Sequence, residues 1–294
     1  MHQLRNPYTL ILCIALTSNH FVSNTSPSGK MLIVALTVAL LVLPSLNCTE
    51  IYYIRPSANT TCPLHPCYTL SVYAGHNHSH FKTQTLQFLP GDHALDVNIT
   101  TQSIQQLEMI GSSSAGIPTR VVCSSNVGFA FRDISKVKVN GLAFVSCARI
   151  FRNLIHDTSL RVTYISHYAL YLESVLMTEI TDCTFQDSYG SALVVVGSHV
   201  VLRGSNKFLG NCWRCLGGGC EWGSIGCAGG SVYARRSSLN FSGNNSFTNN
   251  SAYKGGGVYI LASDMIISGN TIFTINSAGW SGGGVTAVYS NWLR

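Results

Sequence analysis

Charged side chains are scarce in this sequence. Lys, Arg, Asp and Glu make up 10% of its 294 residues, whereas 46% of the residues are hydrophobic. A chain this apolar is expected to fold around a core rather than remain disordered. It has no run of Lys or Arg, and its net charge of +6 reflects few acids rather than many bases. A nucleic-acid partner is therefore not expected.

Long amphipathic helical patterns are also missing. Apolar and polar residues instead alternate in short runs, as in Leu239/Phe241 and Val258/Ile260, and clusters of Gly, Asn and Ser separate these runs. Alternation is typical of strands, and such clusters are typical of turns. The absence of helical windows argues against helical bundles and predicts an all-β protein.

Hydrophobic runs long enough to span a membrane are lacking as well. The longest apolar run, Met31 to Leu43, falls short of the roughly 20 residues that a spanning helix needs. Its length, with Lys30 just before it, fits the core of a signal peptide. We expect residues 1–48 to be a leader, with translation starting at Met1 or Met31, and the mature protein to be secreted. The alternative is an uncleaved anchor at residues 31–46, which would make the protein a membrane-tethered adhesin.

A repeated pattern dominates the C-terminal part of the chain. Each copy reads Phe-x-x-Asn and is followed by Gly-Gly-x-Val, in units of about 26 residues. The Phe/Asn pairs are Phe208/Asn211, Phe247/Asn250 and Phe273/Asn276, and the glycine pairs are Gly229-Gly230, Gly255-Gly256 and Gly282-Gly283. Units of this length with several short strands and no helix indicate a parallel β-helix, a single-stranded solenoid.

Stacking of such units predicts the roles of the repeated residues. The three phenylalanines would form an interior aromatic column, and the three asparagines would form an amide ladder at a bend. The glycine pairs would permit a left-handed or tightly bent backbone. We expect a cap and first strands at residues 49–100 and the β-helix at 101–294, with clear repeats from 200. The sequence stops in the middle of a unit, which predicts a truncated product.

The cysteines fit an oxidising compartment. Cys62 and Cys67 flank a proline-containing loop that a local disulfide could close. Residues 212–227 read as an insertion that carries four cysteines, Cys212, Cys215, Cys220 and Cys227. Two disulfides across this insertion are predicted, and a zinc site is the alternative because Cys212-x-x-Cys215 has ligand spacing. Three further cysteines, Cys123, Cys147 and Cys183, could pair between coils and leave one odd thiol.

Sequons for N-linked glycosylation are frequent and fit a secreted protein. The candidates in the mature chain are Asn59, Asn77, Asn98, Asn240, Asn244 and Asn249.

The Phe-x-x-Asn and Gly-Gly-x-Val pairs resemble the repeats of the polymorphic outer membrane proteins. Ser231, Gly257 and Gly284 stand where that pattern has alanine. The stretch from Tyr52 through Cys62 to His93 resembles the N-terminal part of secreted animal proteins with a right-handed β-helix domain. The resemblance implies a right-handed, pectin-lyase-like β-helix in an extracellular setting, and it implies no specific activity.

Many parallel β-helices cleave acidic polysaccharides, a chemistry that needs clustered carboxylates or calcium-holding acids. This chain has twelve acids, and only Glu179 and Asp182 are weak catalytic candidates. The resemblance sharpens this point, because the Asp-Asp pair and the Gly-His-Gly expected of polygalacturonase-like members are both missing. His76, His78 and His80 alternate, which could place them on one strand face around a metal, but a solvated loop is the simpler interpretation.

These observations predict a secreted, non-catalytic rod for extracellular recognition, adhesion or scaffolding. Its partner would be an extracellular protein or a glycan, and no cofactor or metal is expected. A polysaccharide lyase or glycosidase and a tethered adhesin are the alternatives.

Overall fold

The chain divides into two units, Met1–Cys48 and Thr49–Arg294, and the fold described here is that of the second. The computed structural model describes residues 49–57, 60–62, 64, 66–75, 82–112, 117–124, 127–147, 168–212 and 228–293. The predicted leader and the alternative membrane anchor therefore lie outside the described residues. So do the three alternating histidines, the insertion after Cys212, and the sequons at Asn59 and Asn77.

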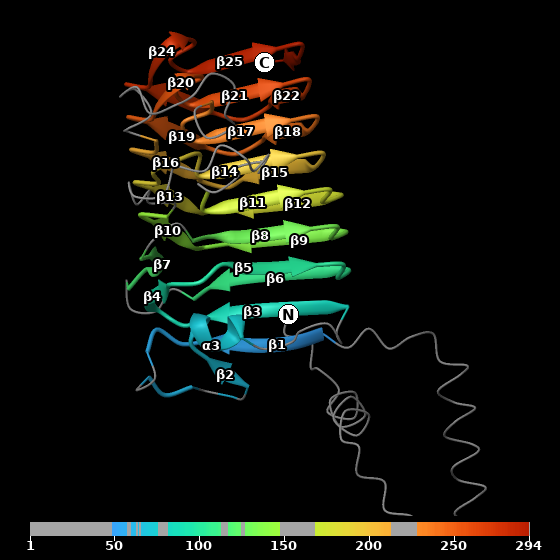
Figure 1. Ribbon diagram of the computed structural model, residues 1–294, viewed down its shortest axis with the longest axis vertical. Coiled ribbons are helices and arrows are strands. Elements are labelled where there is room, and N and C mark those ends of the chain that lie inside the picture. The colour runs from blue at the N-terminus through green and yellow to red at the C-terminus, as the bar shows by residue number, and fades with distance from the viewer. Residues whose placement is uncertain are drawn as a thin grey trace, which may run out of the picture. The chain divides into compact units, whose positions relative to one another are not determined.

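Three parallel sheets dominate this unit, which is all-β as predicted (Figure 1). Sheet A consists of β2 (Cys67–Tyr68), β1 (Thr49–Ile54), β3 (Thr83–Phe88), β6 (Gln106–Gly111), β9 (Lys136–Asn140), β12 (Met177–Thr181), β15 (His199–Arg203), β18 (Ser238–Phe241), β22 (Asp264–Ile267) and β26 (Asn291–Leu293). Sheet B consists of β4 (Gly91–Leu95), β7 (Thr119–Cys123), β10 (Ala143–Val145), β13 (Thr184–Gln186), β16 (Lys207–Leu209), β19 (Asn245–Thr248) and β23 (Thr271–Thr274). Sheet C consists of β5 (Ile99–Gln102), β8 (Phe129–Arg132), β11 (Leu170–Glu173), β14 (Leu193–Val196), β17 (Val232–Arg235), β21 (Val258–Leu261) and β25 (Val285–Val288). A further pair, β20 (Ser251–Lys254) and β24 (Ser277–Ser281), is also parallel.

The chain visits the sheets in a fixed order. From β3 onward it passes from sheet A to sheet B to sheet C and then returns to sheet A, one layer further along. Because each strand pairs with the equivalent strand of the next layer, residues at the same position in successive layers lie in one file. Val232, Val258 and Val285 of the repeat, for example, are direct partners in sheet C.

A short α-helix, α3 (Leu70–Ala74), lies beside β1 and β2 at the N-terminal end of the unit, an element that the all-β prediction did not include (Figure 1). Its Leu70 and Tyr73, three residues apart on one helical face, are both buried. Tyr73 packs edge-on against Tyr52 at 5.2 Å, and its hydroxyl donates to Oε1 of Gln84 at 3.2 Å. The helix thereby covers the first layer of the core.

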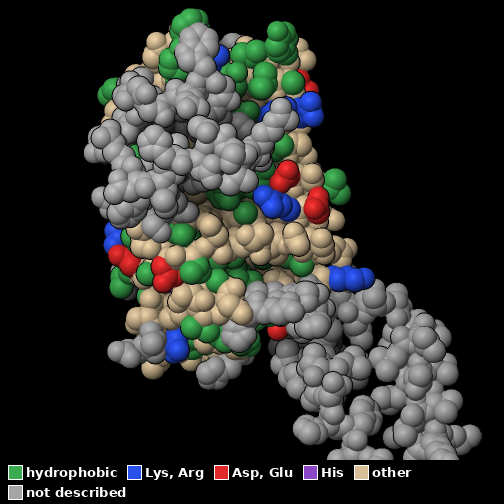
Figure 2. All heavy atoms as spheres, in the orientation of Figure 1, with side chains coloured by type: hydrophobic (Ala, Val, Ile, Leu, Met, Phe, Trp, Pro, Cys, Tyr) green, Lys and Arg blue, Asp and Glu red, His purple; other side chains and the backbone are tan. Residues whose placement is uncertain are grey.

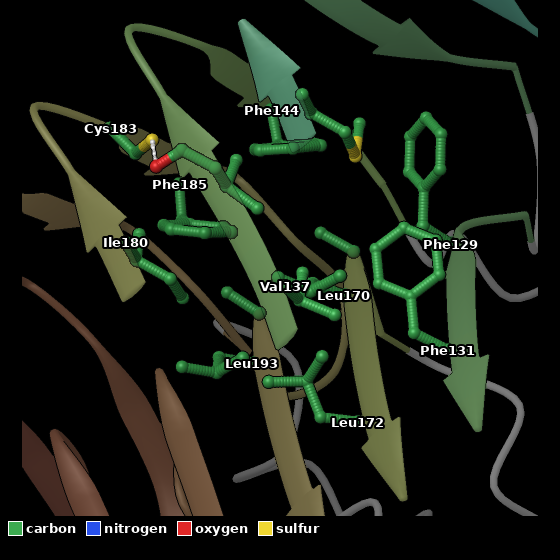
Figure 3. Packing of buried hydrophobic residues seen from close by; sticks show 14 of the residues in the cluster. Phe129, Phe131, Val137, Phe144, Leu170, Leu172, Ile180, Cys183, Phe185 and Leu193 are labelled. Atoms are coloured by element: carbon green, nitrogen blue, oxygen red, sulfur yellow. Dashed lines mark hydrogen bonds between the residues drawn. The ribbon is translucent and has the colours of Figure 1, made fainter. Parts of the chain in front are cut away.

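Five aromatic rings form a continuous column behind sheet B. Centroid distances along the file Phe144, Phe185, Phe208, Phe247 and Phe273 are 5.0, 4.9, 4.6 and 4.8 Å, with the ring planes within 12° of parallel. The first four of these rings are fully buried. The column is therefore two layers longer than the three phenylalanines of the sequence repeat, and Figure 3 shows its start at Phe144 and Phe185.

The asparagines follow the column at the corner after sheet B. The backbone N–H and Nδ2 of Asn211 both donate to Oδ1 of Asn250, at 3.0 Å each. Asn250 donates in the same way to Oδ1 of Asn276, at 3.0 and 2.9 Å. The residue before each asparagine has positive φ, and in the last layer that residue is Ile275 at 56°. A left-handed residue thus turns each asparagine inward, where its amide binds the neighbouring layers.

The two glycines of each pair have different roles. The first has positive φ, as at Gly229 (73°), which a side chain disfavours. The second lies where adjacent layers touch, since a Cβ on Gly230 would be 2.1 Å from the carbonyl oxygen of Gly256. A larger residue at the second position would force the layers apart.

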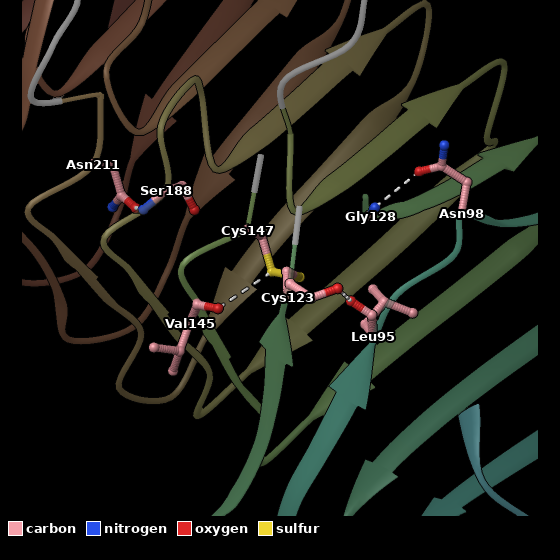
Figure 4. The surroundings of a disulfide bond; sticks show 9 residues. Leu95, Asn98, Cys123, Gly128, Val145, Cys147, Ser188 and Asn211 are labelled. Atoms are coloured by element: carbon pink, nitrogen blue, oxygen red, sulfur yellow. Dashed lines mark hydrogen bonds between the residues drawn. A yellow bond between two sulfur atoms is a disulfide. The ribbon is translucent and has the colours of Figure 1, made fainter. Parts of the chain in front are cut away.

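Two disulfides join described residues. Cys62 and Cys67 close the predicted loop, and Cys123 pairs with Cys147 one layer away (Figure 4). Cys147 lies in the same file as Ser188 and Asn211, so the disulfide occupies the position that the amide ladder takes in later layers. Among the cysteines that the structure describes, Cys183 is a free, buried thiol, and burial raises its pKa to about 12, which keeps it protonated.

One buried histidine makes stability depend on pH. His93 is almost fully buried, its Nε2 lies 2.7 Å from the carbonyl oxygen of Leu89, and burial lowers its pKa below the ordinary 6.5. Between the folded pKa and about 6.5, the unfolded chain binds a proton that the folded chain excludes. The free energy of unfolding should therefore fall as pH drops from 6.5 through the folded pKa and then level off.

Urea unfolding between pH 7.5 and 4.5 measures this effect. A His93→Gln variant should lose this part of the pH dependence, and His199→Gln on sheet A is the matched control for removal of a histidine. An unchanged slope in the His93 variant would contradict the assignment.

Candidate interaction surface

Sheet A has ten strands, against seven in each of sheets B and C, and its outer face is the candidate surface. Because side chains alternate along a strand, every second residue of sheet A faces away from the core. Its central outward file runs through Thr85, Glu108, Lys138, Glu179, Val201, Asn240 and Ile266. Five of the seven residues are polar, although Thr85 and Val201 are themselves buried and Ile266 is exposed, so the middle of the file, from Glu108 to Glu179, is its charged part.

Opposite charges alternate within this surface. Nζ of Lys138 lies 3.8 Å from Oε1 of Glu108, and Nε of Arg203 lies 3.1 Å from Oε1 of Glu179. Lys138 and Glu179 are also direct neighbours in the strand register. Figure 2 shows acidic and basic side chains next to each other on the face of the molecule that is turned toward the viewer. Pairs this exposed contribute little to stability, so their main effect is to pattern the surface.

The two weak catalytic candidates have separate structural contacts. Glu179 pairs with Arg203 on sheet A, as described above. Asp182 occupies a left-handed corner position, and its Oδ1 accepts a hydrogen bond of 2.8 Å from the backbone N–H of Ser205. The Glu179 carboxylate is thus engaged in a surface ion pair, and the Asp182 carboxylate in a turn hydrogen bond. Within the described part of the chain, no hydrogen bond joins the two carboxylates to each other.

Metal ligands do not gather in the part of the chain that the structure describes. No group of three or more His, Cys, Asp or Glu side chains there could hold an ion. Cys212 is disulfide-bonded, so its sulfur is not available as a thiolate ligand for the zinc alternative. The other cysteines of the insertion, Cys215, Cys220 and Cys227, lie outside the described residues.

Four candidate sequons fall within described segments. Asn98, Asn244 and Asn249 are exposed, and Oδ1 of Asn98 accepts a hydrogen bond of 3.0 Å from the backbone N–H of Gly128 (Figure 4). Asn240 is half-buried in the central file of sheet A, and its Oδ1 accepts from Ser268. A glycan at Asn240 would stand on the candidate surface.

The outer face of sheet C differs in character. Its outward file contains Ala130, Tyr171, Val194, Tyr233 and Tyr259, which form a second apolar cluster and are all buried. The Arg132 guanidinium lies 5.6 Å from the centre of the Tyr171 ring and pairs with Glu173 at 2.9 Å. Burial raises the pKa of Tyr171. This file was missed by the sequence analysis, although the tyrosines at equivalent repeat positions, Tyr233 and Tyr259, were a visible signal.

Comparisons with known proteins found no relative of this chain. No family model, curated protein or solved structure matches the chain. The assignment of a surface therefore depends on the geometry alone. Within the residues that the structure describes, no helix is long and apolar enough to cross a membrane.

Proposed function

We propose that the mature protein is a secreted right-handed parallel β-helix of the pectin-lyase-like kind, which acts as a non-catalytic rod for extracellular recognition or scaffolding. The cyclic order of three parallel sheets supports the β-helix, and crossovers between parallel strands are almost always right-handed. The Cys62–Cys67 and Cys123–Cys147 disulfides support an oxidising, extracellular compartment.

The observation that carries the proposal is the outer face of sheet A. Its central file carries charged side chains in three successive layers, at Glu108, Lys138 and Glu179, and the strand spacing between layers is about 4.8 Å. Such a surface suits an extended extracellular partner, a glycan or a protein, that makes many weak contacts at once. Charge complementarity would then set specificity and association rate.

Binding screens test this function. The purified protein would be applied to glycan and extracellular-protein arrays, and Lys138→Glu should weaken binding of any partner found by about tenfold. Lys207→Glu is the matched control, since it makes the same charge change on sheet B. Binding that is insensitive to Lys138→Glu would exclude the sheet A face.

A uronate-cleavage assay on the same preparation tests the opposing enzyme hypothesis. We expect no turnover. Turnover that is lost in Glu179→Gln or Asp182→Asn would overturn the non-catalytic assignment.

A further inference from the structure

Ser188 interrupts the amide ladder at the corner after sheet B. It lies in the file of Asn211 and Asn250, and the disulfide-bonded Cys147 precedes it in this file (Figure 4). The residue before Ser188, Asp187, has a φ of 54°, and the residue before Asn250 has a φ of 55°. The backbone therefore turns Ser188 inward in the same way as the asparagines, and Ser188 is fully buried.

An asparagine carboxamide in this ladder makes a fixed set of hydrogen bonds with the adjacent layers. Oδ1 of Asn250 accepts from the backbone N–H and from Nδ2 of Asn211, at 3.0 Å each. Its Nδ2 donates to Oδ1 of Asn276 at 2.9 Å and to the carbonyl oxygen of Phe208 at 3.0 Å. A serine in the same file is too short to make this set of bonds by itself.

The groups that a carboxamide would bind are present around Ser188, but its side chain does not bind them. Among the described residues, Oδ1 of Asn211 accepts only the backbone N–H of Ser188, at 3.1 Å, one bond fewer than the next asparagine in the ladder. The carbonyl oxygen of Phe144 corresponds to that of Phe208, yet no side chain of the described segments donates to it. The backbone N–H of Cys147 likewise has no acceptor within those segments. Oγ of Ser188 is itself buried without a partner there.

Buried serines at the corner after sheet C are fully bonded, so Ser188 is an exception. In this serine ladder, the backbone N–H of Ser198 donates to Oγ of Ser237, and that of Ser237 donates to Oγ of Ser263, at 3.3 and 3.0 Å. Oγ of Ser237 donates in turn to the carbonyl oxygen of Arg235 at 2.8 Å. A buried hydroxyl that makes no hydrogen bond is unfavourable, so the surroundings of Ser188 call for a further partner.

The groups around Ser188 match the bonding capacity of one water molecule. The backbone N–H of Cys147 and the hydroxyl of Ser188 offer hydrogens, whereas Oδ1 of Asn211 and the carbonyl oxygen of Phe144 accept them. All four residues are fully buried. Water accepts two hydrogen bonds and donates two, and buried waters typically bind otherwise unsatisfied polar groups. A cation would meet the N–H hydrogen and an anion would meet two carbonyl-type oxygens, so the site favours a neutral ligand.

We propose that the corner between Asn211 and Cys147 is an internal hydration site, in which one long-lived water molecule takes the place of the ladder carboxamide at Ser188. The water accepts from the backbone N–H of Cys147 and from the hydroxyl of Ser188. It donates to Oδ1 of Asn211 and to the carbonyl oxygen of Phe144. The hydrogen-bonded file thereby continues from the asparagine layers to the layer of the disulfide.

Nuclear magnetic resonance of the ¹⁵N-labelled protein, with its disulfides intact, tests this site. The backbone N–H of Cys147 should show a nuclear Overhauser cross-peak to bound water. The cross-peak should persist in Ser188→Ala, which separates bound water from the exchanging hydroxyl of Ser188. It should disappear in Ser188→Asn, because the new carboxamide supplies the same bonds and displaces the water.

Thermal unfolding of the same variants gives a second measure. Ser188→Ala should lower the Tm by about 3 °C, because the water loses one of its bonds, and Ser188→Asn should raise the Tm by about 3 °C. Ser231→Ala is the matched control. Its Oγ is also buried without a partner among the described residues, but its neighbours in the file, Ala192 and Gly257, have no polar side chain. This change should keep the cross-peak and should not lower the Tm.

Three results would overturn the proposal. The N–H of Cys147 could show no cross-peak to water, or one that Ser188→Ala abolishes and that therefore comes from the hydroxyl. Ser188→Ala could leave the Tm unchanged or raise it, as expected for a hydroxyl that has no partner at all. Ser188→Asn could keep the cross-peak or lower the Tm, which would mean that water does not occupy the place of the carboxamide. None of these results depends on the sheet A face, so failure here leaves the proposed function untouched.

Discussion

Replacement of Phe208 by alanine is expected to lower the free energy of unfolding by about 4 kcal/mol. The ring is fully buried between Phe185 at 4.9 Å and Phe247 at 4.6 Å. Its removal leaves a cavity in the middle of a column whose neighbours are held in place by the strand register. The layers on either side are bonded along their backbones, so they cannot move together to fill the gap.

Urea unfolding followed by intrinsic fluorescence measures this loss. Phe208→Leu is the control, because it keeps most of the buried volume and loses only the ring stacking, and it should cost about 1 kcal/mol. An alanine variant as stable as the leucine variant would mean that the column collapses around the cavity. Such a result would contradict a rigid interior.

Loss of Asn250 is expected to have an effect of similar size. Its Oδ1 accepts from the backbone N–H and Nδ2 of Asn211, and its Nδ2 donates to the carbonyl oxygen of Phe208 at 3.0 Å. The side chain is fully buried. Alanine would leave several buried groups without partners, at about 1–3 kcal/mol each, so a loss of about 4 kcal/mol is expected.

The matched control is Asn244→Ala, an exposed asparagine in the same layer, which should change stability by less than about 0.5 kcal/mol. Asn250→Asp keeps the acceptor oxygens and removes the Nδ2 donor. Its stability therefore shows how much of the loss comes from the donated hydrogen bonds and how much from the accepted ones. Hydrogen exchange at the amide of Asn211 gives an independent measure, since that N–H loses its acceptor in the alanine variant. Unchanged protection there would contradict the ladder.

Much of the layered core could be predicted because the repeat is in phase. Phe208, Phe247 and Phe273 occupy equivalent positions in the sequence, and equivalent positions become neighbours when units stack. The earlier rings, Phe144 and Phe185, are in the same file, but the sequence around them matches the repeat less well. Only the strand register shows that they continue the column.

The serine ladder and the Cys123–Cys147 pair could not be derived from sequence alone. Serine is common in any turn, so Ser237 and Ser263 carry no signal until the corners are aligned. Three cysteines were compatible with several pairings, and the register decided among them by bringing Cys147 beside Cys123. The short helix at Leu70 was missed for a related reason, because five residues are too few to show a helical period.

The candidate surface depends most on tertiary structure. Alternation along the strands showed which residues face outward, but outward-facing residues need not be exposed. Lys138 and Glu179 on sheet A lie on an open face, whereas Tyr171 and Tyr233 on sheet C are buried although they also point away from the core. No local pattern distinguishes the two cases, because the burial of an outward side chain depends on the contacts that it makes with neighbouring layers.

Local alternation and an in-phase repeat were by themselves sufficient to determine the strands, the buried phenylalanines and the turn asparagines, because both are properties of residues close in sequence. Which files stay open to solvent and which cysteines pair were decided only by the stacking of distant segments. The physical reason is that hydrogen bonds between layers join residues that are a whole repeat apart or more. Their partners, and therefore the groups left without partners, exist only once the register is set.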